Sequence, residues 1–150
     1  MKNKELIIFD LDGTLIDTVP DLNKAVNYGL STHNFPNIDL EHTRKAIGNG
    51  VAKLVERSVP KGTPIDVYLD TLIDFEMYYS EHAFDLTKPY EKIYEVTNEL
   101  KTRGYRLAVS TNKLEYIATD LINKCFPNIF ETVCGDDKSR AKKPAPDSIN

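Results

Sequence analysis

The sequence predicts an α/β protein with a parallel sheet and an inserted helical segment, on three observations. The first is an unbroken apolar run from Leu6 to Phe9 that leads directly into Asp10. Continuous hydrophobicity of this kind is typical of a parallel strand covered on both faces. The second is that two later strand-like segments, 105–109 and 130–134, are separated by a helical pattern, as in a βαβ unit. The third is a stretch of roughly 70 residues with helical patterning alone, which is too long for an ordinary connection.

Two carboxylates stand at the end of the first predicted strand. Asp10 and Asp12 are one residue apart, and side chains at positions i and i+2 of an extended backbone point the same way. Gly13 then allows the chain to turn sharply away behind them. Because ligands bind at the carboxyl ends of the strands in open α/β sheets, we expect both carboxyl groups to address one reacting group.

The helical segment begins directly after this motif. Apolar residues recur at helical spacing across Leu22–Leu30, and Pro20 is well tolerated in a first helical turn. Shorter helices are expected between residues 40 and 55. A longer helix is expected to begin with Thr63 as its N-cap. The residues of that helix predicted to face inward are Ile65, Tyr68, Leu69, Leu72 and Ile73.

The sequence predicts a domain boundary on each side of this helical segment. No strand is predicted between Leu15 and about Asp85, so residues 17–87 are expected to form an all-helical domain of their own. The chain segments 16–20 and 84–90 are the expected hinges.

The sheet domain resumes after the insert. A helix with its apolar residues on one face ends at Gly104, and a strand over 105–109 follows at once. If the connection is the usual right-handed crossover, this strand delivers Thr111 to the edge that carries the two carboxylates. A third short strand over 130–134 is followed by a polar loop over 135–147.

The composition excludes several classes of protein. The chain has 150 residues, a formal net charge of −4 and 41% hydrophobic residues, enough for a packed core. A nucleic-acid partner is not expected, because a phosphate backbone selects a basic face. No apolar run reaches the ~20 residues of a membrane span and no signal-peptide pattern is present, so we expect a cytoplasmic protein without a membrane partner. The two cysteines lack metal-site spacing and are expected to be reduced.

The hexapeptide at 10–15, Asp-Leu-Asp-Gly-Thr-Leu, resembles the first motif of the haloacid dehalogenase (HAD) superfamily of phosphatases. The resemblance implies a Rossmann-like parallel sheet as the core and an inserted all-helical cap domain. Receiver domains of phosphorelay proteins also phosphorylate an aspartate at a strand end, but their first strand is not followed by this hexapeptide and a long helical insert.

The resemblance implies a role for several polar residues. Asp10 corresponds to the nucleophile that forms an aspartyl-phosphate, and Asp12 to the acid and base that serves the leaving oxygen and the attacking water. Both correspond to Mg²⁺ ligands, Asp12 through its backbone carbonyl. Thr111 corresponds to a hydroxyl that binds the phosphoryl group, with Ser110 as the alternative, and Lys143 corresponds to a charge-stabilising cation. The further substrate-binding residues expected at this edge are Gly13, Thr14 and Asn112.

Two more segments resemble the bacterial phosphoglycolate phosphatases within this superfamily. They are Ile47-Gly48-Asn49-Gly50-Val51 and the run from Gly135 to Pro144. In that family the Ile-Gly-Asn-Gly loop of the cap faces the active site, so Gly48, Asn49 and Gly50 become candidate substrate-binding residues, with a plain interhelical turn as the alternative. The resemblance implies a Mg²⁺-dependent phosphatase of small phosphate esters, first of all 2-phosphoglycolate. A sugar-phosphate phosphatase or phosphomutase of the same cap class and a catalytically inactive fragment are the alternatives.

The resemblance has one departure. Family members continue past the lysine of the third motif to a fourth strand with an acidic motif, whereas this sequence ends at Asn150. We therefore expect a core domain of residues 1–16 and 88–150 that is incomplete at its C-terminus, and doubtful activity for the chain as given. The first strand is then expected to form an exposed apolar edge, which favours association. Asp136 and Asp137 precede the lysine and are interpreted as loop residues.

Overall fold

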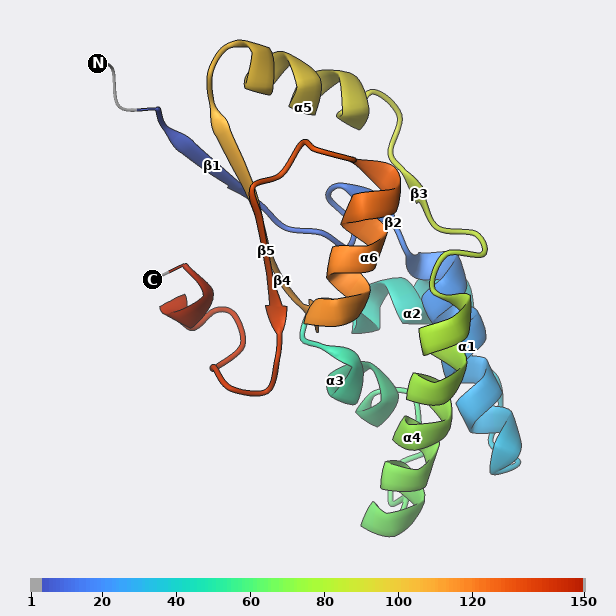
Figure 1. Cartoon of the computed structure of the whole chain (residues 1–150). Helices are drawn as coiled ribbons and strands as arrows, with labels where there is room; N and C mark the ends of the chain where they lie inside the picture. Colours follow the sequence, from blue (N-terminus) through green and yellow to red (C-terminus); the bar gives the residue numbers. More distant parts are fainter. Residues whose placement is uncertain (1–3, 150) are drawn as a thin grey trace. The chain divides into compact units, whose positions relative to one another are not determined.

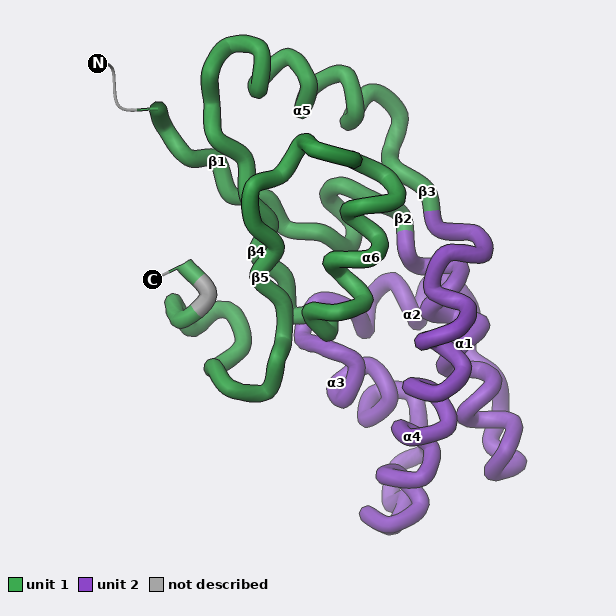
Figure 2. The backbone as a smooth tube through the Cα atoms, viewed as in Figure 1, with its two compact units in different colours: residues 1–17, 88–150 green, residues 18–87 purple. Residues whose placement is uncertain are grey.

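The computed structural model describes residues 4–149 of the chain (Figure 1). These residues divide into two compact units (Figure 2). The first unit runs up to Asp17 and resumes at Lys88, and the second runs from Thr18 to Thr87.

The first unit is built on a three-stranded parallel sheet (Figure 1). Its strands, in spatial order, are β1 (Leu6–Phe9), β4 (Arg106–Leu114) and β5 (Thr132–Asp136). Phe9 is the register partner of Val109, so Asp10 and Ser110 follow at the same edge of the sheet. The predicted α/β class with a parallel sheet is confirmed.

Two helices of the first unit pack on this sheet. α5 (Ile93–Thr102) contacts β4, and α6 (Glu115–Cys125) contacts both β4 and β5. α6 connects β4 to β5 and so completes a βαβ unit. Its buried face consists of Ile117, Ala118, Leu121 and Ile122. A short 3-10 turn, η1 (Pro146–Ser148), lies near the C-terminus.

β1 is less covered than the sequence predicts. Leu6 and Ile8 are 47% and 40% exposed, while Ile7 and Phe9 are partly buried. The expectation of a strand covered on both faces is therefore wrong for the described part of the chain. The physical reason is that Leu6 and Ile8 lie on one face of β1, and among the described residues β4 is the one element that makes extensive contact with this strand, so no helix covers that face closely. The better-covered face includes an edge-to-face contact between the rings of Phe9 and Phe130, with centroids 5.9 Å apart.

β4 and β5 both extend further along the chain than the sequence predicts. β4 continues to Leu114, and β5 includes Gly135 and Asp136, which the sequence places in a loop. The reason is tertiary pairing, since Leu114 is the register partner of Asp136. A Cβ atom at position 135 would lie 2.5 Å from Glu115 Cα, so only glycine permits this approach.

A two-stranded antiparallel ribbon stands where the chain leaves and re-enters the first unit. β2 (Ile16–Asp17) pairs with β3 (Lys88–Pro89). The backbone N–H of Tyr90 also donates to the carbonyl oxygen of Leu15 at 3.2 Å. The expectation of no strand after Leu15 is wrong in this detail, because a two-residue strand is too short to show a hydrophobic period.

The second unit contains the four helices predicted for this segment. They are α1 (Val19–Thr32), α2 (Leu40–Ala46), α3 (Val51–Glu56) and α4 (Ile65–His82). α1 packs along α4, while α2 packs on α1 and α3 on α4. Gly29 permits the close approach of α1 to α4, because a Cβ there would lie 2.9 Å from the Thr71 carbonyl oxygen. Within residues 4–149, no helix combines the length and the hydrophobicity needed to cross a membrane.

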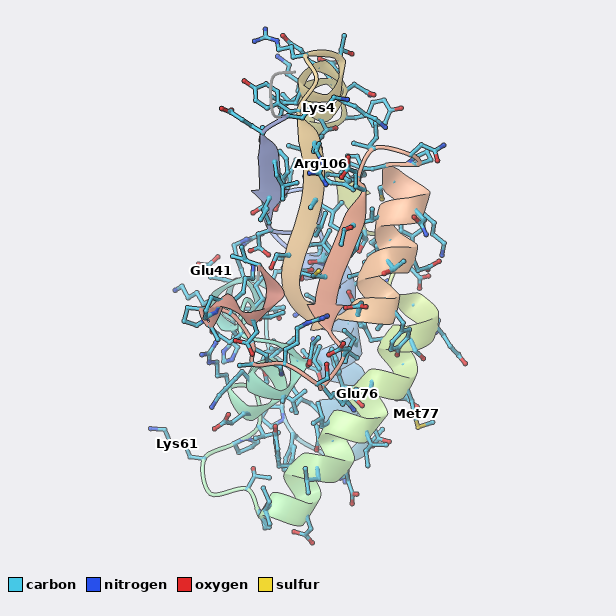
Figure 3. The ribbon with its side chains drawn as sticks, turned by 60° about the vertical axis from the view of Figure 1, so that its left-hand side comes forward. Lys4, Glu41, Lys61, Glu76, Met77 and Arg106 are labelled. Atoms are coloured by element: carbon cyan, nitrogen blue, oxygen red, sulfur yellow. The ribbon has the colours of Figure 1, made fainter. Side chains whose placement is uncertain are left out.

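α4 differs from the prediction in its start and in its buried face. Pro64 occupies the N-cap position, and the Thr63 hydroxyl donates to a carbonyl oxygen of the preceding loop instead of capping the helix. The helix buries Phe75 and Tyr79, and Met77 between them projects from it into solvent (Figure 3). Three residues predicted to face inward are instead exposed: Ile65 at 71%, Leu69 at 47% and Ile73 at 53%. Apolar residues occur around most of this helix, so packing against α1 and α3 selects the buried face.

A buried carboxylate joins the two ends of the second unit. Asp21 is 2% exposed, and its Oδ2 accepts hydrogen bonds from the backbone N–H groups of Leu86 and Thr87 and from the Thr87 hydroxyl, each at 2.8 Å. Three donors satisfy a carboxylate that is removed from water. These bonds tie the first turn of α1 to the last two residues of the unit.

Candidate active site

The two carboxylates that follow β1 are each paired with a different lysine. Asp10 Oδ1 lies 3.1 Å from Lys143 Nζ, and Asp12 Oδ1 lies 2.9 Å from Lys113 Nζ. The side chain of Asp10 is 49% exposed and that of Asp12 is 16% exposed. Leu11 between them is fully buried and anchors the segment. The site thus holds an accessible carboxylate beside a shielded one.

A tight turn carries the chain away behind these carboxylates. The Leu11 carbonyl oxygen accepts from the backbone N–H groups of Thr14, Leu15 and Ile16 at 3.2, 3.0 and 3.3 Å. Gly13 has a φ of +75°, a left-handed conformation that glycine adopts without steric cost. Gly13 and Thr14 are both exposed in this turn, and their contact with substrate stays a prediction.

The end of β4 presents four buried polar residues in succession. They are Ser110, Thr111, Asn112 and Lys113. The Thr111 hydroxyl oxygen accepts from the backbone N–H of Lys113 at 3.1 Å. Thr111 also lines a small cavity together with Lys143, while Ser110 is the register partner of Cys134 within the sheet. Of the two hydroxyl candidates, this geometry favours Thr111.

Lys143 reaches Asp10 from the loop that follows β5, and β4 holds it there. Asn112 Oδ1 accepts from the Lys143 backbone N–H at 2.7 Å, and Asn112 Nδ2 donates to the Lys143 carbonyl oxygen at 3.2 Å. The ammonium of Lys143 donates to the Ser110 carbonyl oxygen at 2.7 Å and to Asp10 Oδ1 at 3.1 Å. The side-chain amide of Asn112 therefore forms hydrogen bonds with the Lys143 backbone, and its predicted contact with substrate stays a prediction.

The acidic residues at the end of β5 are engaged in their own loop. Asp136 forms an ion pair with Lys142 at 3.3 Å and accepts from the backbone N–H of Lys138 at 2.9 Å. Asp137 accepts from the hydroxyl and the backbone N–H of Ser139 at 2.6 and 2.9 Å, and these hydrogen bonds lower the pKa of Asp137 below its ordinary value. Their contacts support a role in holding this loop.

Comparison with known proteins identifies the family to which this arrangement of residues belongs. Residues 7–150 match the family model of the haloacid dehalogenase-like hydrolases. The chain belongs to this family.

Relatives of this haloacid dehalogenase-like hydrolase include enzymes named phosphoglycolate phosphatase. One from Caulobacter vibrioides is 37% identical over 146 residues, which are 95% of this chain and 62% of the relative. One from Colwellia psychrerythraea is 35% identical, and the matched region is 97% of this chain and 68% of the relative. A crystal structure of a predicted phosphoglycolate phosphatase from Haemophilus somnus has a TM-score of 0.89 and 30% identity, covering 97% of this chain and 68% of that one. The chain thus spans less than two thirds of the Caulobacter relative.

The donor set of this haloacid dehalogenase-like hydrolase fits a hard divalent cation. The Asp10 carboxylate and the backbone carbonyl oxygen of Asp12 are the predicted ligands just after β1, and Mg²⁺ prefers oxygen ligands of this kind. Within residues 4–149, no group of three or more His, Cys, Asp or Glu side chains is arranged to hold a metal by itself. One carboxylate and one carbonyl oxygen are compatible with Mg²⁺, which usually keeps several waters and also binds substrate phosphate. Asp10 and Asp12 stay the predicted ligands.

The Gly48-Asn49-Gly50 segment lies in the second unit, between α2 and α3. Gly48 and Gly50 have φ values of +112° and +88°, and Gly50 is the N-cap residue of α3. These left-handed conformations explain both glycines as parts of a turn. Asn49 is exposed at the tip, and its contact with substrate stays a prediction.

Two residues have roles that the sequence pattern did not suggest. Lys113 pairs with Asp12, and the available signal was its place in the polar run 110–113 that follows the predicted strand 105–109. Asp21 was visible only as an acidic residue in a first helical turn, where such residues are common. Its bonds to Leu86 and Thr87 join residues that are far apart in sequence, so no local pattern reveals them.

Proposed function

We propose that this chain hydrolyses small phosphomonoesters through an aspartyl-phosphate on Asp10, with 2-phosphoglycolate as the first candidate substrate. The observation that carries the proposal is the pairing of an accessible Asp10 with Lys143 and of a shielded Asp12 with Lys113. The relatives named phosphoglycolate phosphatase support this substrate class.

In the first step, the phosphoryl group passes to Asp10. A carboxylate oxygen of Asp10 attacks phosphorus, the bond from phosphorus to the leaving oxygen breaks, and Asp12 donates its proton to that oxygen. Lys143 provides positive charge beside the transferring group, where negative charge develops. Thr111 lines the same small cavity as Lys143 and suits a hydrogen bond to a phosphoryl oxygen.

In the second step, water releases the phosphate. Asp12, now a carboxylate, takes a proton from water while the water oxygen attacks phosphorus. The bond between phosphorus and the Asp10 oxygen breaks, so that inorganic phosphate leaves and both carboxyl groups return to their starting states. Mg²⁺, held by Asp10 and Asp12, would offset the repulsion between the carboxylates and the phosphate.

We propose that the second unit acts as the cap that selects substrate. The support is its insertion between Asp17 and Lys88, at the two strands of the β2–β3 ribbon. The turn between α2 and α3 has glycines at positions 48 and 50, with no Cβ atoms to hinder the approach of a small anion, and Asn49 offers an exposed amide between them.

Turnover by the whole chain tests the proposal. Release of inorganic phosphate is measured on 2-phosphoglycolate, on a sugar phosphate and on p-nitrophenyl phosphate, with Mg²⁺ and with excess EDTA. Mg²⁺-dependent turnover with the highest kcat/KM on 2-phosphoglycolate supports the proposal, whereas no turnover of any of the three substrates favours the alternative of a catalytically inactive fragment. A higher kcat/KM on the sugar phosphate would show that the proposed substrate is wrong, and it would still support the proposed reaction.

A matched pair of variants tests the nucleophile. Asp10→Asn removes the attacking carboxylate and is expected to abolish turnover with an unchanged thermal unfolding midpoint. Asp120→Asn removes an exposed carboxylate on α6, in the same unit, and is expected to keep wild-type rates. Wild-type turnover by Asp10→Asn contradicts the covalent mechanism.

A further inference from the structure

Lys113 is a buried lysine that contacts the proposed acid and base of the reaction. Its side chain is 2% exposed, and its Nζ lies 2.9 Å from Asp12 Oδ1. Lysine is almost never fully buried unless it is paired, because an ammonium removed from water carries a large desolvation cost. Asp12 supplies that pairing, so the position of each charged group depends on the other.

The backbone of Lys113 is held by contacts within β4 and with β5, although the pairing of the two strands is irregular between Ser110 and Leu114. The Lys113 backbone N–H donates to Thr111 Oγ1 at 3.1 Å. Its carbonyl oxygen lies against Gly135 of β5, where an added Cβ would come within 2.7 Å of it. β4 is also the central strand, with β1 and β5 on its two sides. A cation presented from such a scaffold limits the rotation of the carboxylate that it contacts.

The two lysines of the site have different tasks. Lys143 stands beside Asp10, where the phosphoryl group is transferred and charge develops. Asp12 transfers a proton instead, and a general acid must lie within hydrogen-bond reach of the oxygen that it protonates. A buried partner that holds the Asp12 carboxyl group in one place meets that requirement.

We propose that Lys113 is a positioning residue that holds the Asp12 carboxyl group where it exchanges a proton with the leaving oxygen and with the attacking water. The proposal rests on the proposed phosphomonoesterase function. The proposal assigns the two lysines to different events of the reaction. Without Lys113, a displaced Asp12 impairs proton transfer, while Asp10 and Lys143 keep the geometry needed for phosphoryl transfer.

The test compares leaving groups that need a general acid with one that does not. Lys113→Met removes the ammonium and keeps most of the side-chain volume. For 2-phosphoglycolate, whose leaving alkoxide needs a proton, we expect kcat to fall about 10²-fold, with KM changed by less than about threefold. For p-nitrophenyl phosphate, whose leaving group departs without a proton, we expect the pre-steady-state burst of p-nitrophenolate to slow by less than about threefold while steady-state turnover falls.

The controls separate positioning from folding. Lys124→Met, on the exposed face of α6, removes a lysine that is also paired with an aspartate and is expected to keep wild-type kinetics. Lys113→Arg is expected to restore part of kcat, because it keeps the charge. Lys113→Met placed in an Asp12→Asn background is expected to cause no further loss, since the group that it positions is already gone. The proposal is overturned if the p-nitrophenolate burst slows as much as the steady-state turnover of both substrates, or if nothing slows at all.

Unfolding measurements keep this inference distinct from the proposed function. A double-mutant cycle in urea, with Lys113→Met, Asp12→Asn and both together, reports the coupling of the two side chains without any turnover. If the wild-type chain hydrolyses none of the substrates, the proposed function fails, and the cycle still decides whether the two groups are coupled. Additive effects in that cycle overturn the positioning role whatever the activity.

Discussion

The side-chain amide of Asn112 holds the backbone of Lys143 at both of its hydrogen-bonding groups. The Lys143 N–H donates to Asn112 Oδ1 at 2.7 Å, and the Lys143 carbonyl oxygen accepts from Asn112 Nδ2 at 3.2 Å. A loop residue is thereby placed by a residue of β4. The contact matters because the ammonium of the same lysine reaches Asp10.

Replacement of Asn112 is expected to displace Lys143 and to slow the reaction. Asn112→Asp keeps the acceptor and loses the donor, and Asn112→Ala loses both. We expect kcat to fall roughly tenfold for Asn112→Asp and roughly 10²-fold for Asn112→Ala, because small displacements of catalytic groups are costly. Asn98→Ala on α5 is the matched control. If Asn112 binds substrate directly, steady-state kinetics will show the loss in KM instead.

Asp12→Asn is expected to remove the proton donor and to leave phosphate binding largely intact. The predicted loss in kcat is on the order of 10²–10⁴-fold, the usual contribution of a general acid or base. Competitive inhibition by inorganic phosphate measures the binding and is expected to change little. A large loss of phosphate affinity would instead identify Asp12 as a binding group.

Asn49→Ala is expected to change substrate preference more than overall turnover. The side chain is exposed at the tip of the turn between α2 and α3, in the unit proposed to select substrate. We expect the ratio of kcat/KM between 2-phosphoglycolate and p-nitrophenyl phosphate to fall. An equal loss on both substrates would show that the turn is structural only.

Asp21→Ala is expected to destabilise the protein, because it removes the acceptor that joins α1 to residues 86 and 87. Loss of hydrogen bonds to a buried charged group predicts a fall of about 2–4 kcal/mol in the free energy of unfolding. Urea unfolding at neutral pH measures the change. Asp66→Ala, at an exposed position in the first turn of α4, is the matched control and is expected to change stability little. A wild-type midpoint for Asp21→Ala would contradict the inferred role.

Ile8→Lys is expected to reduce self-association of the chain. In the described sheet β1 pairs on one side only, and the exposed Leu6 and Ile8 make that edge apolar. An edge lysine opposes the pairing of such a strand with another chain. Sedimentation velocity over a range of concentrations measures the association. Val96→Lys, at a similarly exposed apolar position on α5, tests whether added charge alone has the same effect.

Local patterns were sufficient for much of this protein. The apolar run before Asp10 predicted a strand, and the spacing of Asp10, Asp12 and Gly13 predicted a turn with two carboxylates, as the structure shows. The four helices of the second unit also follow from periodicity. These features depend on residues that are close to one another in the sequence, so a local pattern is sufficient to predict them.

Other features were decided by tertiary structure alone. β5 extends to Asp136 because it pairs with Leu114, and α4 buries Phe75 and Tyr79 because α1 and α3 pack on that side. The sequence by itself determined which residues are able to do chemistry at the end of β1. Only the tertiary structure decided that Asp10 is paired with Lys143 and Asp12 with Lys113, because those distances depend on how β1, β4 and the loop after β5 pack together.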